Sequence, residues 1–150
     1  MKALVQRVSC GSVTVDGDVI GAIGRGLVVL LGVREGDDDS AARQLARKTA
    51  ALRIFPDDQD RMNRSLHEIG GEALVVSQFT LYADTRKGNR PSFIRAGDPD
   101  LAESLYRTYV EALRAELSAD AVKTGRFGAM MQVDIRNDGP VTIELCTDAD

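Results

Sequence analysis

The sequence predicts one α/β domain, spanning residues 1–150, in which a strongly curved, barrel-like mixed β-sheet packs against two helices. One observation is that continuous apolar runs such as Leu27–Leu31 and Ala73–Val76 are typical of strands buried on both faces. Another is that two segments carry apolar residues at helical spacing behind a capping residue. The resulting order, β-β-β-α-β-α-β-β-β, contains more strands than helices, and 150 residues suffice for one core that buries roughly 70% of the unfolded surface.

The first half of the chain is expected to form three strands and one helix. The expected strands are residues 3–15, 18–20 and 27–31. Asp16-Gly17 is a favoured two-residue hairpin signal between the first two. Asp39 or Ser40 can cap a helix that runs to about Arg53, and residues 57–71 are expected to be irregular. The inward face of this helix is expected to hold Ala42, Leu45, Ala46, Thr49 and Leu52.

The second half is expected to hold four strands and the second helix. The expected strands are residues 73–76, 121–124, 130–136 and 141–146. Asp98-Pro99 supplies the cap and first turn of a helix that ends near Leu117. Its inward residues are expected to be Leu101, Leu105, Tyr109, Ala112 and Leu113. Asn137–Pro140 is expected to be a hairpin connection between the last two strands. Because strands outnumber helices, one sheet face is expected to lack cover, and a homodimer would cover it.

Composition and charge argue against several classes of protein. The net charge of -4 argues against a broad basic face that coats nucleic acid, although it leaves room for gripping one end of an RNA. No apolar run approaches the roughly 18 residues that cross a bilayer, and the N-terminal segment turns polar too soon for a signal peptide. Cys10 and Cys146 lack metal-type spacing, which favours reduced thiols in a cytoplasm. We expect no cofactor and no metal, because no motif for either is present.

The single histidine, His67, restricts the possible chemistry. Serine-type triads usually need a histidine base, and most catalytic zinc sites need at least one histidine with further ligands nearby. His67 lies in a polar stretch before Gly70-Gly71, where an exposed turn without catalytic duty is the favoured interpretation. An enzyme with this sequence is therefore not expected to use imidazole.

A polar stretch that follows the buried strand at residues 73–76 is the candidate functional site. Ser77, Gln78 and Thr80 stand at the C-terminal end of this strand, where open sheets usually place ligand sites. The following segment, residues 81–97, carries a local net charge of +3; its cations are Arg86, Lys87, Arg90 and Arg95, and its acid is Asp84. Hydroxyls and an amide beside a basic, glycine-bearing loop indicate a site for a polar, anionic ligand.

Four motifs extend this interpretation to a family. They are Ser77–Leu81, Lys87–Phe93, Phe127-Gly128-Ala129 and Asn137–Thr142. In this order and spacing they resemble the D-aminoacyl-tRNA deacylases, the D-tyrosyl-tRNA deacylase family. The likeness also includes Gln6-Arg7-Val8 and Leu52–Phe55 and covers nearly the whole chain. Each motif alone is weak, but four together are specific.

The resemblance implies an enzyme that hydrolyses the ester joining a D-amino acid to the 3′ adenosine of tRNA. It implies an active site at a homodimer interface, where residues 77–80 of one subunit face Gly139-Pro140 of the other. A cis bond between Gly139 and Pro140 is expected to direct carbonyls at the α-carbon substituents, so that an L side chain clashes while a D side chain points to solvent. Glycine is expected to pass as well, including glycine mischarged on the tRNA for alanine.

The chemistry available to these residues agrees with such a reaction. Aminoacyl esters are already reactive, so orientation and oxyanion donors matter more than a strong base. Backbone N–H groups near Phe79 and Thr80 are the expected donors, while Ser77 and Gln78 orient the ester and the ribose. The vicinal 2′-hydroxyl of the terminal ribose is a candidate to activate water. Thr80 acting as a covalent nucleophile is the alternative, although an unassisted hydroxyl is a poor nucleophile.

The remaining candidate residues are assigned binding roles as hypotheses. Phe79 and Met131 are expected to wall the adenosine pocket, with Phe127 in the same substrate-binding group; plain core packing is the alternative. Arg7 is expected to brace the Gly-Pro turn, and a surface ion pair is the competing interpretation. Contacts with tRNA phosphates, or otherwise solvated charge, are expected of Arg86, Lys87 and Arg90.

Two other functions are compatible with the same residues. A binding module could hold a nucleotide or an RNA end without chemistry, and it would protect the ester that an enzyme hydrolyses. A small metabolic enzyme with an anionic substrate is disfavoured by the lack of a cofactor motif or metal cluster.

Overall fold

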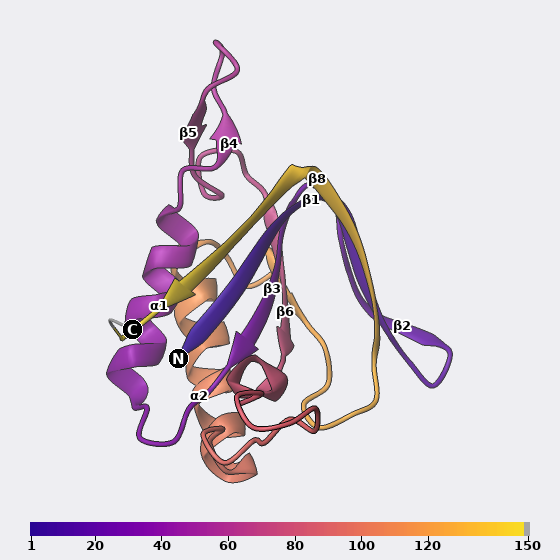
Figure 1. Ribbon diagram of the computed structural model, residues 1–150. Helices are drawn as coiled ribbons and strands as arrows, with labels where there is room; N and C mark the ends of the chain where they lie inside the picture. The colour runs from indigo at the N-terminus through magenta and orange to yellow at the C-terminus, as the bar shows by residue number, and fades with distance from the viewer. Residues whose placement is uncertain (149–150) are drawn as a thin grey trace.

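The computed structural model describes residues 1–148; residues 149 and 150, the end of the predicted domain, lie outside the described part. The elements, in order, are β1 (Lys2–Val15), β2 (Asp18–Ile23), β3 (Gly26–Gly32), α1 (Asp39–Ala51), β4 (Phe55–Pro56), β5 (Met62–Arg64), β6 (Glu72–Ser77), the 3-10 helix η1 (Phe79–Tyr82), α2 (Pro99–Glu116), β7 (Val122–Thr124) and β8 (Gln132–Cys146) (Figure 1). Both helices lie on the same side of the main sheet (Figure 1).

The main sheet is mixed and strongly curved, as the sequence predicts. Its strand order is β2-β1-β3-β6-β7, and β8 pairs with the other edge of β1. β1 pairs antiparallel with β3 through residues 2–8 and with β2 through residues 11–15, whereas β3, β6 and β7 are parallel. Because β1 exchanges one neighbour for another halfway along, the sheet curls into a nearly closed barrel. The predicted fold class is therefore confirmed: one domain with a barrel-like mixed sheet and two packed helices.

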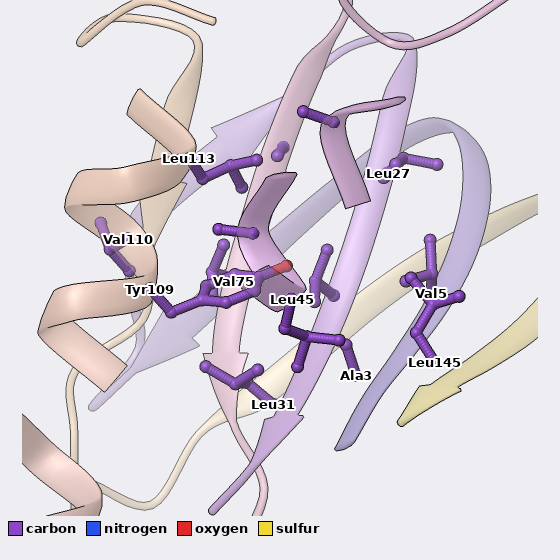
Figure 2. Close-up of a cluster of buried hydrophobic side chains, with 14 of the residues drawn as sticks. Ala3, Val5, Leu27, Leu31, Leu45, Val75, Tyr109, Val110, Leu113 and Leu145 are labelled. Atoms are coloured by element: carbon purple, nitrogen blue, oxygen red, sulfur yellow. The ribbon is translucent and has the colours of Figure 1, made fainter. Parts of the chain in front are cut away.

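The two sides of the sheet bury separate groups of apolar side chains. The helix-side cluster includes Ala3, Val5, Leu27, Leu31, Leu45, Val75, Tyr109, Val110, Leu113 and Leu145 (Figure 2). The barrel-side cluster consists of Val8, Val13, Ile23, Val28, Leu74 and Val76, with the partly buried Ile20, Leu30, Met131, Val133 and Ile135 packed against it. The barrel-side cluster contains no residue of α1 or α2, so within the described chain no helix covers that side.

A buried hydrogen bond joins the two helices inside the helix-side cluster. The Tyr109 hydroxyl donates to Thr49 Oγ1 over 2.8 Å, and the Thr49 hydroxyl donates in turn to the Leu45 carbonyl over 2.8 Å. Both Tyr109 and Thr49 are fully buried, and burial raises the pKa of the Tyr109 hydroxyl. The pair therefore satisfies the polar atoms that helix packing removes from water.

The hairpin predicted for the last two strands is wrong. β8 is one strand from Gln132 to Cys146, and it pairs with β1 along nearly its whole length instead of folding back on itself. Arg7 of β1 faces four residues of β8, 138–141, because Gln6 pairs with Thr142 and Val8 pairs with Asn137. Residues 138–141 therefore form a bulge within a strand, directly after the paired Asn137. Its turn-forming residues suit a bulge as well as a hairpin, and the sequence pattern does not separate the two.

Several smaller expectations are also corrected or confirmed. Helix α1 is capped by Asp38, one residue before the predicted cap, and it ends at Ala51. Residues 55–64 form the short β4–β5 hairpin where irregular structure was expected. The Asp16-Gly17 hairpin is confirmed, with φ of 50° and 82°. Within residues 1–148, no helix has the length and apolar character needed to cross a membrane.

The two cysteines lie too far apart to bond to each other. Cys10 stands opposite Arg136 and Cys146 stands opposite Lys2 in the β1–β8 ladder. Lys2 and Cys10 are eight residues apart, about 26 Å measured along the strand, whereas a disulfide needs Cα atoms within roughly 7 Å.

We predict that replacing Thr49 by valine destabilises the fold more than replacing Tyr109 by phenylalanine. Thr49→Val keeps the shape but leaves the buried tyrosine hydroxyl without its acceptor, a cost of about 1–3 kcal/mol. Tyr109→Phe leaves the Thr49 hydroxyl bonded to Leu45, a cost of about 1 kcal/mol. Urea unfolding measures both changes. Equal effects would contradict this account of the buried pair.

Candidate active site

The end of β6 and the start of η1 form the predicted site, at the C-terminal edge of the parallel strands. Ser77 pairs with Leu31, and the Gln78 backbone N–H donates to the Leu31 carbonyl over 2.8 Å. η1 then turns over the end of β3. A Cβ at Gly32 would lie 3.1 Å from Leu81 Cβ and 3.2 Å from the Gln78 carbonyl oxygen, so the missing side chain lets η1 approach closely.

Two backbone donors and a hydroxyl converge at the first turn of η1. Gln78 Nε2 donates to Thr80 Oγ1, which leaves the threonine proton available to another acceptor. Among residues 1–148, the backbone N–H groups of Phe79 and Thr80 donate no hydrogen bond, and both residues are exposed. Unpaired N–H groups at the start of a helical turn are suited to a negatively charged oxygen.

No proton acceptor is held next to Thr80 in the described structure. His67 is exposed, as predicted, in the turn that precedes β6, at the opposite end of that strand. Asp84 is engaged elsewhere: Arg86 donates to its Oδ1 through Nε over 2.9 Å and to its Oδ2 through Nη2 over 2.5 Å. These hydrogen bonds from Arg86 hold the pKa of Asp84 well below its usual range. The site can therefore position a ligand and donate hydrogen bonds to it, but within the described residues it holds no strong base next to Thr80.

Phe79, Met131 and Phe127, the apolar residues predicted to bind substrate, do not form one cluster. Phe79 is 57% exposed, and its ring packs edge-on against Phe93 with centroids 5.0 Å apart. Met131 packs against the barrel-side cluster. Phe127 packs against the helix-side cluster, with its ring centroid 6.0 Å from that of Tyr106. The half-buried Phe93 thus forms an aromatic pair with the exposed Phe79, which the sequence motif contains but does not single out.

The basic loop is closed by backbone pairing, and its three predicted cations differ in availability. Asp84 and Ser92 exchange backbone hydrogen bonds of 2.8 and 2.9 Å across the base of the loop. The charge of Arg86 is neutralised by Asp84. Lys87 and Arg90 are exposed, and neither forms an ion pair with any residue in the described range. Of these three, Lys87 and Arg90 are therefore free to meet an anionic ligand.

The bulge that contains Gly139-Pro140 is exposed and held from two directions. Its Gly139–Pro140 peptide bond is cis. Arg7 Nε donates to the Asp138 carbonyl over 3.1 Å, and Arg7 Nη1 donates to the Ile54 carbonyl over 2.7 Å. The side-chain amide of Asn137 donates to the Arg7 carbonyl over 3.0 Å and to the Val141 carbonyl over 3.1 Å. The bulge is therefore a fixed piece of main chain on the surface.

Glycine is required at position 139 for two reasons. Its φ is +126°, a conformation that residues with a side chain rarely adopt. A Cβ there would lie 2.8 Å from Val141 Cγ2 and 3.0 Å from Arg7 Nη2. The absence of a side chain thus lets Arg7 reach over the bulge.

Within one chain, the bulge and the strand end lie far apart. Ser77 is in register with Leu31 and, through it, with Ala3, whereas the bulge faces Arg7. Four residues along a strand span about 13 Å, and three strand spacings from β6 to β8 add about 14 Å across the sheet. In Figure 1 the bend of β8 and the helical turn after β6 lie at opposite ends of the central strands β1 and β3.

Asn137 is the residue at the bulge that the sequence interpretation missed. Its place before Asp138-Gly139 is typical of a turn, and turn formation was sufficient to explain it. The structure shows instead that its side chain spans the bulge, bonding the carbonyls on both sides. The sequence offered no signal for this role, because Asn137 stood in the predicted connection between two strands and its partner in β1 is Val8.

The strand end, the basic loop and the braced bulge are features of a site for a polar, anionic ligand, and comparison with known proteins identifies the family. Residues 4–146 match the model of the D-Tyr-tRNA(Tyr) deacylase family. A D-aminoacyl-tRNA deacylase of Roseiflexus castenholzii is 63% identical over 147 residues, which cover 97% of this chain and 91% of that protein. One from Syntrophotalea carbinolica is 57% identical, covering 97% of this chain and 96% of that protein. The chain therefore belongs to the D-Tyr-tRNA(Tyr) deacylase family, as its motifs predicted.

Two solved structures share the fold. One, described as c-Myc DNA Unwinding Element Binding Protein, has a TM-score of 0.95 at 46% identity and covers 99% of this chain and 100% of its own. Another, described as a probable eukaryotic D-amino acid tRNA deacylase, has a TM-score of 0.78 at 20% identity and covers 96% of this chain and 97% of its own. At that identity the second likeness concerns the fold alone.

Proposed function

We propose that this protein hydrolyses the ester of D-aminoacyl-tRNA and thereby removes D-amino acids from tRNA in the cytoplasm. The observation that carries the proposal is the match to the deacylase family over residues 4–146, nearly the whole chain. The exposed N–H groups of Phe79 and Thr80 support it, because they suit the oxyanion that forms when water attacks an ester. Glycyl-tRNA, including glycine mischarged on the tRNA for alanine, is a further proposed substrate.

In this mechanism the positioning of the ester and of the attacking water replaces catalysis by a strong base. One preorganised oxyanion donor contributes on the order of 3 kcal/mol, and orientation of the attacking water adds several more. Ser77 and Gln78 orient the ester and the ribose, and the terminal ribose supplies its 2′-hydroxyl to activate water. The Gln78–Thr80 hydrogen bond supports this assignment, because it orients the threonine hydroxyl without taking its proton.

The site is proposed to be completed by a second copy of the chain. Gly139-Pro140 and the strand end stand at opposite ends of one sheet, so a bulge that selects against L-amino acids has to come from another subunit. The barrel-side cluster supports such an arrangement, since it is apolar, only partly buried along β8 and covered by no helix within residues 1–148. Bracing by Arg7 and Asn137 would keep the bulge carbonyls rigid enough to exclude an L side chain.

A role as a binder without chemistry is the second candidate function. It is favoured by the 46% identity to a structure described as a DNA-element-binding protein, and by the lack of a positioned base in the described residues. Lys87 and Arg90 would serve either function, because phosphate contacts give affinity without chemistry.

We predict that D-aminoacyl-tRNA loses its amino acid in the presence of this protein, whereas the matched L-aminoacyl-tRNA decays only at its spontaneous rate. Release of labelled amino acid from tRNA carrying D- or L-tyrosine measures both. Slower decay of both esters in the presence of the protein would identify a binder. Equal acceleration of the hydrolysis of both esters would contradict the proposed selection of D- over L-amino acids by the bulge.

We predict that Thr80→Ala retains deacylase activity within about tenfold of the parent protein, since it removes one hydrogen bond. Removal of a covalent nucleophile instead lowers kcat on the order of 10⁶-fold. Single-turnover rates with D-aminoacyl-tRNA separate the two results. A loss of activity near 10⁶-fold would instead indicate that Thr80 is a covalent nucleophile.

We predict that the protein is a dimer in solution and that Ile135→Asp, on the barrel-side cluster, produces a folded monomer without activity. A charge on this face opposes its burial against a second chain. Light scattering gives the oligomeric state, and urea unfolding shows whether the variant still folds. Met62→Asp, at an exposed apolar position of β5, is the matched control and is expected to stay dimeric and active. A fully active monomer would contradict an active site that two chains form together.

A further inference from the structure

The outer face of α1 is basic in a way that its packing does not explain. The cations on this face are Arg43, Arg47 and Lys48, and all three are exposed. The opposite face supplies Ala42, Leu45, Ala46, Thr49 and Ala50 to the core. From residue 40 to residue 53 the chain has four cations and no acid, although its net charge is -4. We call Arg43, Arg47 and Lys48 the α1 basic face.

These charges are not compensated by neighbouring acids. On α2, Arg107 pairs with Glu103 at 2.8 Å and Arg114 pairs with Glu111 at 2.9 Å, the usual exchange between successive helical turns. On α1, Asp39 is four residues before Arg43, but its Oδ1 accepts the Thr108 hydroxyl over 2.9 Å. Within residues 1–148, no cation of the α1 basic face forms an ion pair.

The α1 basic face is joined to the candidate active site by the loop that precedes the helix. In this loop the Glu35 N–H donates to the Arg95 carbonyl over 3.1 Å, and the Val33 carbonyl accepts from the Gly97 N–H over 2.9 Å. The segment after the basic loop therefore lies directly against the chain that enters α1. The helix then leads away from the site (Figure 1), and Lys48 stands ten residues, about 15 Å, beyond the Asp38 cap.

This placement suits RNA phosphates that lie away from the 3′ end. The face lies along a helix that leads away from Thr80, where the terminal adenosine is proposed to bind, and it is on the helix side, away from the barrel-side cluster where the second chain is proposed to bind. We propose that the α1 basic face binds backbone phosphates of the tRNA body, as a second RNA contact separate from the basic loop. The proposal rests on the proposed function, because it takes tRNA to be the substrate.

The competing explanation is local helix stability. Arg47 and Lys48 lie near the C-terminus of α1, where cations interact favourably with the helix dipole. Such a role would change unfolding but not the affinity for RNA. Phosphate contacts would do the reverse, and they would be sequence-independent and weakened by salt.

The test compares two substrates and two charge-matched variants. The variant Arg43→Gln/Arg47→Gln/Lys48→Gln removes three charges with residues that favour helix, and Arg61→Gln/Arg107→Gln/Lys123→Gln removes three charges elsewhere. One substrate is full-length D-aminoacyl-tRNA, and the other is a short single-stranded oligonucleotide of the tRNA 3′ end carrying the same ester. Urea unfolding checks both variants.

For full-length tRNA, we expect the α1 variant to raise KM about tenfold or more at physiological salt, with kcat nearly unchanged. The slope of log KM against log salt is expected to become shallower by about 2, or roughly 0.7–0.9 per lost phosphate contact. The short substrate and the control variant are expected to show no change. An unchanged KM for full-length tRNA, an equal loss with the short substrate, or a loss confined to stability would each overturn the proposal.

Failure of the proposed function would be seen separately, as unmodified protein that cleaves neither substrate. Binding of uncharged tRNA, followed by fluorescence anisotropy, then decides the question of the α1 basic face alone. Weaker binding by the α1 variant than by the control variant supports the second contact, and equal binding overturns it.

Discussion

Backbone hydrogen bonding along β1 is the constraint on which the rest of the structure depends. A strand has two edges, and β1 gives one edge to β8 and divides the other between β3 and β2. The division falls between Val8 and Gly11, so the sheet turns there. The extra residues of β8 lie opposite Arg7, next to the same turn. The Gly139-Pro140 bulge is therefore the outer side of a corner that the sheet needs in order to curl.

The same corner affects which side chains of β1 join each group of buried residues. Ala3 and Val5 face the helices, and Val8 faces the other side by ordinary alternation along the strand. The irregular register between Val8 and Cys10 then leaves Val13, five residues further on, on the same side as Val8. At the inner side of the corner, a Cβ at Gly11 would lie 2.8 Å from Val28 Cγ2. The curvature of the sheet and the exposed bulge thus have one physical origin.

Local patterns predicted the parts of the fold that local interactions determine. The continuous apolar runs of β3 and β6, the helix cap at Asp98 and the Asp16-Gly17 hairpin depend on near neighbours, and the structure contains all three. The nature of the 137–140 segment depends on β1, which is distant in sequence, so a turn-like composition could not separate a bulge from a hairpin. The fold class followed from element order, whereas closure of the barrel depends on the register of β1.

The candidate site was predictable to a similar degree. Placement of Ser77, Gln78 and Thr80 at a strand end follows from an apolar run that ends in polar residues, and the structure places them there. The positions of Met131 and Phe127 on different sides of the sheet depend on the path of the connection between β7 and β8, which no spacing encodes. The pairing of Arg86 with Asp84 likewise depends on loop geometry, and it sets Arg86 apart from Lys87 and Arg90 among the three predicted phosphate contacts.

The distance between the bulge and the strand end has a kinetic consequence in the proposed dimer. A catalytic centre divided between two polypeptides exists only while they are associated, so at low protein concentration turnover would rise with the square of the amount of chain present. Proofreading capacity would then respond to expression level more steeply than that of an enzyme whose parts all lie in one polypeptide.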